Sequence, residues 1–430
     1  MHALFQPSRL TRVSLASLMV LALTACGGSS SDEEVIETPE EEHEHSHIDS
    51  RGRLVIAESG ATAVHVFDLD SQSVAQTFAA DHAPSAIYSS PNHRYALLFQ
   101  RNENQVQFVD GGLWQEDHGD HLHDYQAAPQ LLGTRWSGAR PTHYESHDGY
   151  GAIFYDGSTD GTTASSVSLL SDNAIAAGTP VATLSLPLAM HGTAEPRGEY
   201  LLTTYRAPDA SGPSQVELYK RDGAGFNFVQ RFETTCPGLH GSYSNANYIA
   251  FGCTDGVLVV HQQGDSFSAR KLANPADLGA TARIGTIVGH EDLNSFVGIA
   301  SPGHLFAIDP VAGEIKRIQW AEGRTRRAHA IDADGDHLLV LDDQGKLHIL
   351  KTADWSKRAT LDAVANMPTA APFPALTASH AEDQVFLSDV TGKQISVIDV
   401  ETASIKLKYP LNFTPGSLTW LGLPEYEHSH

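Results

Sequence analysis

DHAPSAIYSSPNHRYALLFQRNENQVQFVD, residues 81–110, contains the unit that decides the fold. It runs from a histidine through a short strand, a polar turn and a hydrophobic strand, and a second turn leads to a strand that ends in Asp. After about residue 54 the chain consists of similar short β-branched runs, bounded by Gly, Asp, Asn and Pro. Such a pattern is typical of an all-β protein.

The unit recurs along the chain. Further copies begin at Arg140, Met190, Leu239, Gly289, Ala328 and Ser379. The leading histidines of all copies are His82, His143, His191, His240, His290, His329 and His380, with spacings of 61, 48, 49, 50, 39 and 51 residues. Repeats of roughly 40 to 50 residues with four short strands each indicate a β-propeller.

The two ends of the repeat region complement each other. RLVIAESGATAVHVFDLDSQSVAQTF, residues 53–78, has the pattern of the second, third and fourth strands of a unit, and FTPGSLTWLGLP, residues 413–424, has that of a first strand. Joined in one blade, they close the ring and leave no open sheet edge. We therefore expect a single β-propeller over residues 53–423, with eight blades, or seven if one of the repeats is spurious.

The first 26 residues are expected to be a lipoprotein signal peptide. Arg9 and Arg12 precede a short apolar run that ends in LTAC, in which Cys26 would be lipidated. The run is too short for a membrane span, and a plain secretory signal with a chance Cys is the alternative. Gly27 favours sorting to the outer membrane, by resemblance to sorted lipoproteins. We thus expect an exported, periplasmic protein whose contact with the membrane is this lipid anchor.

Residues 27–52 are expected to be a flexible tether, because their Ser, Gly and Glu content cannot bury enough apolar surface to order them. The segment contains HEHSH, and residues 424–430 form a tail that ends in EHSH. The net charge is −24, with only 28 Lys and Arg. Such a surface repels phosphate backbones, which excludes nucleic acid as a partner, and it concentrates cations.

Two cysteines remain if Cys26 carries lipid. Cys236 and Cys253 flank LHGSYSNANYIAFG, which reads as a β-hairpin with its turn near Asn245. The two cysteines would then face each other across the strands of the hairpin, and in an oxidising compartment this predicts a disulfide. Two free buried thiols are the alternative.

The histidines are the main candidates for chemistry. The first strand of a blade is innermost, so seven histidines at its entry would form a ring at one mouth of the channel, although a Gly-His pair also has structural roles. The insertion at residues 110–130 contains EDHGDHLHD, and imidazole with carboxylate suits Zn²⁺, with Cu²⁺, Ni²⁺ and Co²⁺ as competitors. A loop folded over the mouth would share an ion with neighbouring histidines. The expected metal ligands are His118, Asp120, His121, His123, Asp124, His143, His147, His191 and His240.

These features together resemble a known family. An exported propeller with a His-rich tether, the EDHGDHLHDY and RPTHYESHDG stretches and MHGTAEP resembles the AztD-type periplasmic zinc metallochaperones over most of the chain after residue 43. The resemblance implies Zn²⁺ bound by the insertion loop and channel histidines, accessory capture by His43, His45 and His47, and delivery to the solute-binding protein of a zinc ABC importer. The lipobox is a departure from this family, because a lipid-anchored protein cannot diffuse freely as a carrier. It predicts a monomer that captures zinc at a membrane face.

Other functions remain open at this point. The sequence contains no nucleophile elbow, phosphate-binding Gly loop or CxxCH, so we expect no enzyme. A propeller metalloenzyme, lactonase-like or copper-dependent, is one alternative. A protein-interaction scaffold is another, because the fold alone does not decide function.

Overall fold

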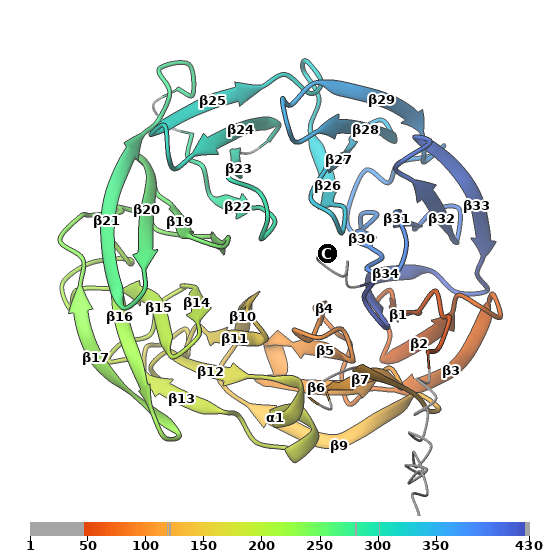
Figure 1. Cartoon of the computed structure of the whole chain (residues 1–430), viewed down its shortest axis with the longest axis horizontal. Helices are drawn as coiled ribbons and strands as arrows, with labels where there is room; N and C mark the ends of the chain where they lie inside the picture. Colours follow the sequence, from red (N-terminus) through yellow and green to blue (C-terminus); the bar gives the residue numbers. More distant parts are fainter. Residues whose placement is uncertain (1–46, 118, 120–121, 280–281, 301, 426–430) are drawn as a thin grey trace, which may run out of the picture. The chain divides into compact units, whose positions relative to one another are not determined.

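The computed structural model describes residues 47–117, 119, 122–279, 282–300 and 302–425. Within these residues, eight four-stranded antiparallel sheets surround a common centre, together with one two-stranded hairpin (Figure 1). The all-β propeller is confirmed, with eight blades rather than seven. Among the described residues, no helix has the length and apolar character needed to cross a membrane.

In each of the first four blades the strands run in the following order from the innermost outward. The composite blade has β34 (Pro415–Leu421), β1 (Arg53–Glu58), β2 (Ala63–Asp68) and β3 (Ser73–Ala79). The next blades are β4 (Ala86–Ser89), β5 (Tyr95–Gln100), β6 (Gln105–Asp110) and β9 (Gln130–Ser137); β10 (Pro141–His147), β11 (Tyr150–Tyr155), β12 (Ser166–Leu170) and β13 (Ala182–Ser185); and β14 (Ala194–Arg197), β15 (Tyr200–Tyr205), β16 (Gln215–Asp222) and β17 (Gly225–Arg231).

The remaining four blades follow the same order. They are β18 (Ser242–Ser244), β19 (Tyr248–Gly252), β20 (Gly256–Gln263) and β21 (Ser266–Ala273); β22 (Thr286–Val288), β23 (Phe296–Ala300), β24 (His304–Asp309) and β25 (Glu314–Ile318); β26 (Arg326–Ile331), β27 (His337–Asp342), β28 (Lys346–Lys351) and β29 (Lys357–Asp362); and β30 (Leu376–Ala378), β31 (Gln384–Asp389), β32 (Gln394–Asp399) and β33 (Ser404–Pro410). Outside the blades lie the hairpin of β7 (Leu113–Asp117) and β8 (Leu122–Gln126), the 3₁₀ turn η1 (Arg101–Glu103) and the helix α1 (Asp172–Ala177).

The ring closes as the sequence predicted. β34 pairs antiparallel with β1, with Leu54 opposite Trp420, so the two ends of the chain share one blade. Each end therefore holds the other in place, and the composite blade closes the ring.

The core lies between the blades. Every residue of β5 and of β27 is buried, whereas β3, an outermost strand, is largely exposed. Hydrophobic clusters cross from blade to blade; one joins Phe99 of β5 to Ile153 of β11. Burial of these apolar faces, at about 25 cal/mol per Å², drives the sheets together.

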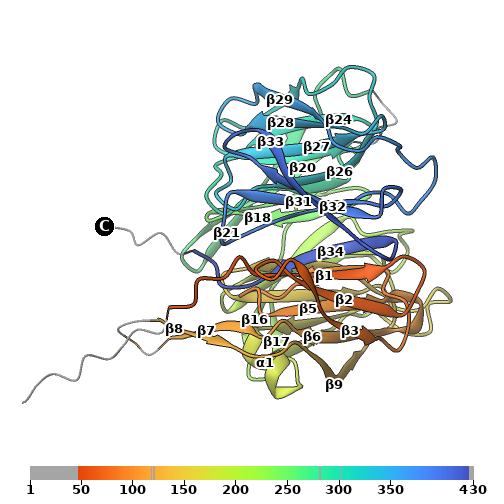
Figure 2. The same cartoon turned by 90° about the vertical axis from the view of Figure 1, so that its right-hand side faces the viewer.

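The even number of strands in each blade gives the propeller two distinct faces. Each blade has four antiparallel strands, so its outermost strand ends where its innermost strand began, and a link then starts the next blade at that side. All innermost strands therefore run the same way. We call the side on which they begin the entry face and the side on which they end the exit face. The hairpin β7–β8 lies between β6 and β9, at the exit face, on the side where the chain leaves β34 (Figure 2).

Candidate metal centre

Three of the leading histidines lie together at the entry face. His143 is the third residue of β10, His191 precedes β14 by three residues, and His240 precedes β18 by two. Because β10, β14 and β18 are the innermost strands of three consecutive blades, they bring the three imidazoles to one place. We call His143, His191 and His240 the triad.

The triad directs its Nε2 atoms at one another. The Nε2 atom of His191 lies 3.2 Å from that of His143 and 3.2 Å from that of His240. Among the described residues, this is the one group of three or more His, Cys, Asp or Glu whose ligand atoms all lie within 4.8 Å of one another. Three nitrogens so placed can hold one ion and leave a fourth coordination position for another ligand.

The outer nitrogens of two triad rings are held by fixed partners. His191 Nδ1 lies 3.1 Å from Asp156 Oδ2, and His240 Nδ1 donates to the Gly285 carbonyl oxygen at 2.9 Å. A proton on Nδ1 leaves the lone pair on Nε2, so these contacts select the tautomer that binds a metal. Carboxylate and carbonyl partners of this kind orient histidine ligands in metal sites.

Asp156 is a site residue that the sequence reasoning missed. It follows β11, its side chain is 3% exposed, and its Oδ2 accepts a hydrogen bond from Arg101 Nη2 at 2.7 Å. The sequence carries only a weak signal for it, an Asp directly after a buried strand in FYDG. Its contact with His191 spans 35 residues and depends on how two adjacent blades pack.

The glycine after each of two triad histidines permits close packing. A Cβ atom on Gly192 would lie 2.1 Å from Thr204 Oγ1 and 2.6 Å from a Phe154 ring carbon, and one on Gly241 would lie 2.8 Å from the Gly285 carbonyl oxygen. A larger residue would push the strand entry away from its neighbours. The His-Gly pairs of the repeat therefore bring the imidazoles close to the next blade.

Burial favours the neutral form of two triad imidazoles, those of His143 and His240. It lowers the pKa of His143 to about 3, and the nearby His191 and His240 rings add to the shift. The pKa of His240 is lowered too, first by burial and then by His191 and Arg283. Neutral imidazole is the form that binds a metal, so protons compete weakly for these nitrogens near neutral pH.

His147, also expected as a ligand, lies at the other end of β10. Arg197 Nη1 donates to His147 Nε2 at 2.7 Å, and burial, followed by Arg197, lowers the pKa of His147 to about 4. Two residues along a strand advance the chain by roughly 6.6 Å, so four residues separate His147 from His143 by far more than one ion can bridge. The structure does not bring His147 to the triad.

The seven leading histidines do not form a single ring. His290 follows β22 by two residues and His380 follows β30 by two, so both lie at the exit face, whereas His82 precedes β4 by four. His329 is the fourth residue of β26. Histidines before and after the innermost strand recur with nearly the same spacing along the sequence. The repeat pattern therefore did not distinguish the two ends of the strand, and the expected single ring of seven histidines is wrong.

The hairpin that carries the His and Asp loop also lies away from the triad. It projects at the exit face, and the triad is at the entry face. Asp124 is buried there and accepts hydrogen bonds from the Ile48 backbone N–H at 2.9 Å and from Gln115 Nε2 at 3.0 Å. His47 Nδ1 lies 3.3 Å from Asp124 Oδ2, so the hairpin and the segment before β1 meet. The structure thus separates the predicted ligands between two faces.

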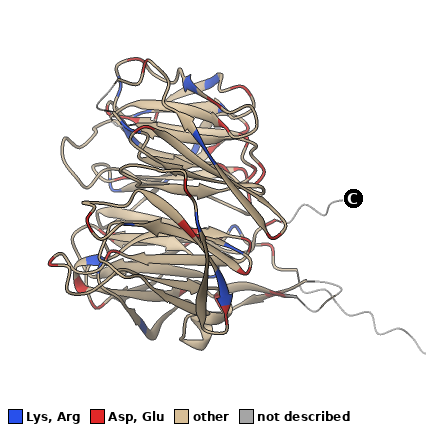
Figure 3. Cartoon of the chain, turned by 90° about the vertical axis from the view of Figure 1, so that its left-hand side faces the viewer, with Lys and Arg blue, Asp and Glu red and all other residues tan. Residues whose placement is uncertain are grey.

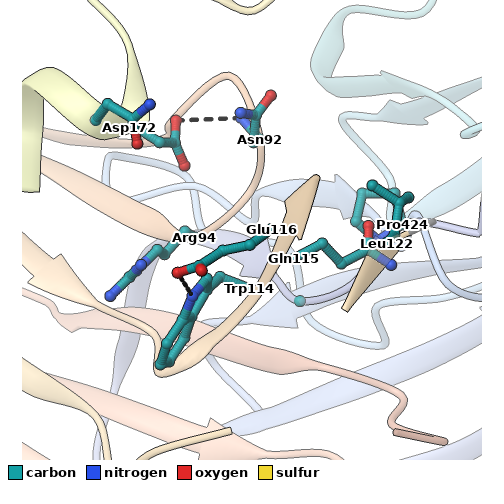
Figure 4. Close-up of a pocket in the computed structure, with 10 residues that line it drawn as sticks. Asn92, Arg94, Trp114, Gln115, Glu116, Leu122, Asp172 and Pro424 are labelled. Atoms are coloured by element: carbon teal, nitrogen blue, oxygen red, sulfur yellow. Dashed lines mark hydrogen bonds between the residues drawn. The ribbon is translucent and has the colours of Figure 1, made fainter. Parts of the chain in front are cut away.

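Aromatic packing supports the base of the hairpin (Figure 4). The Arg94 guanidinium lies 4.0 Å from the Trp114 ring centroid, Trp114 Nε1 donates to Glu116 Oε1 at 2.9 Å, and Trp114 stacks on Tyr125.

Several predicted residues lie outside the described residues; these are Cys26, His43, His45, His118, Asp120, His121 and the C-terminal EHSH.

The predicted cysteine pair is joined. The Sγ atoms of Cys236 and Cys253 are 2.06 Å apart and both residues are fully buried. Cys236 lies four residues before His240, so the disulfide ties the chain that leads into the triad to the end of β19.

Comparison with known proteins supports the fold and the predicted resemblance. The chain is 25% identical over 356 residues to a protein named zinc chaperone AztD from Citrobacter koseri, which covers 81% of each chain. Two solved structures of Citrobacter koseri AztD, one of them the apo form, match with TM-scores of 0.76 and 0.75 at 21% identity, over 87% of this chain and 99% of theirs. The dihydro-haem d1 dehydrogenase NirN matches less well, with a TM-score of 0.55 at 12% identity, over 86% of this chain and 75% of that one.

No family model matches the chain. The resemblance to AztD that the sequence predicted is confirmed, and the structural matches agree on the eight-bladed fold.

Proposed function

We propose that this protein is an exported zinc metallochaperone that takes up Zn²⁺ as cargo at the triad of His143, His191 and His240. The observation that carries the proposal is the convergence of three Nε2 atoms, in an arrangement where the outer nitrogens of His191 and His240 face Asp156 and the Gly285 carbonyl. The relative that the chain matches is named a zinc chaperone and not an enzyme, which agrees with the expectation from the sequence.

The donor set suits zinc. Three imidazoles with one open position match a tetrahedral ion, and the fourth ligand can come from water or from another protein. The thiols of Cys236 and Cys253 are joined in a disulfide, so they offer no thiolate to a soft ion such as Cu(I). Cu²⁺, Ni²⁺ and Co²⁺ compete with zinc at a site of this type.

A carrier must also release its ion. The His191 side chain is 39% exposed, so an incoming ligand can reach the metal from solvent. The chain carries a net charge of −24, and acidic positions occur on loops at both ends of the strands (Figure 3). Such a field raises the local concentration of cations. We propose that the recipient is the solute-binding protein of a zinc ABC importer.

The predicted accessory residues have a transient role in this scheme. His47 meets Asp124 there, and we propose that His43, His45 and His47 on the tether, with His118, Asp120, His121 and His123 of the hairpin loop, collect zinc transiently. The lipid on Cys26 would keep the protein in the periplasm at a membrane surface, more specifically at the outer membrane.

A competition titration tests the proposal. The full mature chain, titrated with zinc against a fluorescent chelator, should take up zinc at sub-micromolar free metal, and H143A/H191A/H240A should lose this uptake. His261→Ala is the matched control, because His261 lies on β20 and stacks on Tyr248 away from the triad. No uptake by the unaltered chain would refute the proposal.

The same preparation separates the alternatives. Zinc should move to the purified solute-binding protein when the two are mixed, as measured by metal analysis of the separated proteins. A redox-active copper centre visible by its absorption would indicate an enzyme instead. Indifference to every metal, with a partner captured by pull-down, would indicate a scaffold.

A further inference from the structure

A second group of histidines lines a cavity at the exit face. The cavity has a volume of about 310 Å³ and is bounded by residues of the innermost strands β4, β18, β22, β26, β30 and β34. Four imidazoles and one indole line it; they belong to His93, His290, His329, His380 and Trp420. We call this cavity the exit chamber.

Three of the imidazoles are neighbours. The rings of His93 and His380 stack with centroids 4.0 Å apart, and each lies against Trp420 at 5.5 and 5.6 Å. His290 is close enough to His380 to lower its pKa, after the larger effect of burial. The three residues come from three different blades, so the topology and not the local sequence brings them together.

The backbone fixes two of these histidines. The Gly422 N–H donates to the His93 carbonyl oxygen at 3.0 Å, and the Glu425 N–H donates to the His380 carbonyl oxygen at 2.8 Å. The chain that leaves β34 therefore lies across both residues. His93 also has a φ of 57°, a left-handed conformation that costs a non-Gly residue energy and is common at functional positions.

The chamber offers nitrogen lone pairs, and one carboxylate approaches them: Asp292 Oδ2 lies 3.6 Å from His290 Nδ1, and the Asp292 N–H donates to the same nitrogen at 3.3 Å. His93 Nδ1 is buried and has no hydrogen-bond partner among the described residues. Asp332 lines the chamber, but its carboxylate accepts hydrogen bonds from His337 Nδ1 at 2.7 Å and from the His337 N–H at 2.9 Å. Arg326 Nη1 donates to His329 Nδ1 at 2.9 Å, so His329 supplies an N–H and not a lone pair.

Burial also favours the neutral form of His93 and His380. It lowers the pKa of His380 to about 4 and that of His93 well below its usual value. A buried polar atom without a partner is costly, and a ligand that accepts its lone pair removes that cost. An all-imidazole donor set selects borderline divalent cations over the hard ions Mg²⁺ and Ca²⁺, which prefer oxygen.

We propose that His93, His290 and His380 form a second metal site, on the opposite face from the triad, that takes a borderline divalent cation such as Zn²⁺. The site stands on its own residues and does not require the triad to bind metal. Among the described residues only the triad has its ligand atoms already within 4.8 Å, so binding in the chamber requires the stacked His93 and His380 rings to separate. We expect its affinity to be the weaker of the two.

A metal-edge anomalous map of the full chain, crystallised with zinc and then with Co²⁺, tests the proposal. A peak in the chamber about 2.1 Å from histidine nitrogens supports it. The same map reports on the triad, so failure of the triad and failure of the chamber are distinguishable. A chamber without a peak, in a crystal whose triad is occupied, overturns the proposal.

Solution experiments give an independent readout. In H143A/H191A/H240A, Co²⁺ should still produce the visible d–d absorption of a nitrogen-bound ion, and adding His380→Ala or His93→Asn should remove at least about 90% of it. Asn is chosen at position 93 because it tolerates positive φ better than most residues. His304→Ala, on β24 away from the chamber, should leave the signal unchanged. A signal that survives both chamber variants in folded protein overturns the proposal.

Discussion

The triad and the exit chamber both contain clustered histidines, yet only the triad has its ring nitrogens already arranged around one point. At the entry face, the Nε2 atoms of His143 and His240 each lie 3.2 Å from His191 Nε2, and a carboxylate and a carbonyl face the outer nitrogens of two of the three rings. At the exit face, His93 and His380 stack face to face. The partner of the outer nitrogen therefore decides whether clustered histidines form a preformed site, because it sets both ring orientation and tautomer.

Removal of the central ring should have the largest effect. His191 contacts both other members of the triad, so His191→Ala leaves two ligands that no longer share a neighbour. We expect zinc affinity to fall by more than about 100-fold, since loss of an outer partner alone costs roughly 10- to 100-fold. Competition with a chelator of known affinity measures the change.

His261→Ala provides the control for this substitution and should bind zinc as the unaltered chain does. If His191→Ala keeps full affinity while remaining folded by circular dichroism, the tight site lies elsewhere, and the contrast between the two faces has no functional meaning.

Loss of the outer partner should have the next largest effect. Asp156→Asn preserves shape but replaces the carboxylate that faces His191 Nδ1 with an amide, which can present an N–H to the ring and favour the wrong tautomer. We expect zinc affinity to fall by roughly 10- to 100-fold. Asp160→Asn, a nearby exposed residue bonded to Ser158 and Thr162, is the matched control in the same titration. Equal affinity in the two variants would show that the carboxylate does not support the triad.

The fold could be predicted from the sequence because its signals are local and repeated. Alternating strands, turn residues and a regular period specify blades, and the complementary patterns of residues 53–78 and 413–424 specify ring closure. The pairing of Leu54 with Trp420 follows from that complementarity. These features need no knowledge of which side chains touch across blades.

The candidate site was less predictable. The repeat pattern identified His143, His191 and His240, whereas His147 was added because it stands close to His143 in the sequence, and it lies at the opposite end of β10. Asp156 was missed, because its contact with His191 exists only after two blades pack. The hairpin was placed over the wrong mouth, since sequence proximity to His143 does not reveal that β9 runs from one face to the other between them.

Acid should destabilise the metal-free protein, and the exit chamber should contribute to this. Burial lowers the pKa of His329 to about 3, that of His380 to about 4 and that of His93 well below normal. An unfolded histidine titrates near 6.5, so between about pH 6.5 and 4 the unfolded chain binds more protons than the folded one. The contribution of these groups is thus complete above pH 6.5 and is lost as pH falls toward 4.

Urea unfolding at several pH values measures this dependence. His380→Gln should make the free energy of unfolding fall less steeply between pH 6.5 and 4 than it does in the unaltered chain. The substitution removes a group that binds a proton in the unfolded chain but not in the folded one. An unchanged slope would mean that His380 titrates normally in the fold and that the chamber is open to solvent.

The hairpin should have the smallest effect on the tight site. It lies at the exit face, so H121A/H123A should leave zinc affinity at the triad within about twofold of the unaltered chain, as expected for distant sites without shared partners. The same change made in H143A/H191A/H240A should reduce the remaining weak zinc uptake slightly, because the hairpin histidines then contribute to it beside the exit chamber. A large loss of tight binding in H121A/H123A would mean that the loop reaches the triad after all, and the two faces would then act as one site.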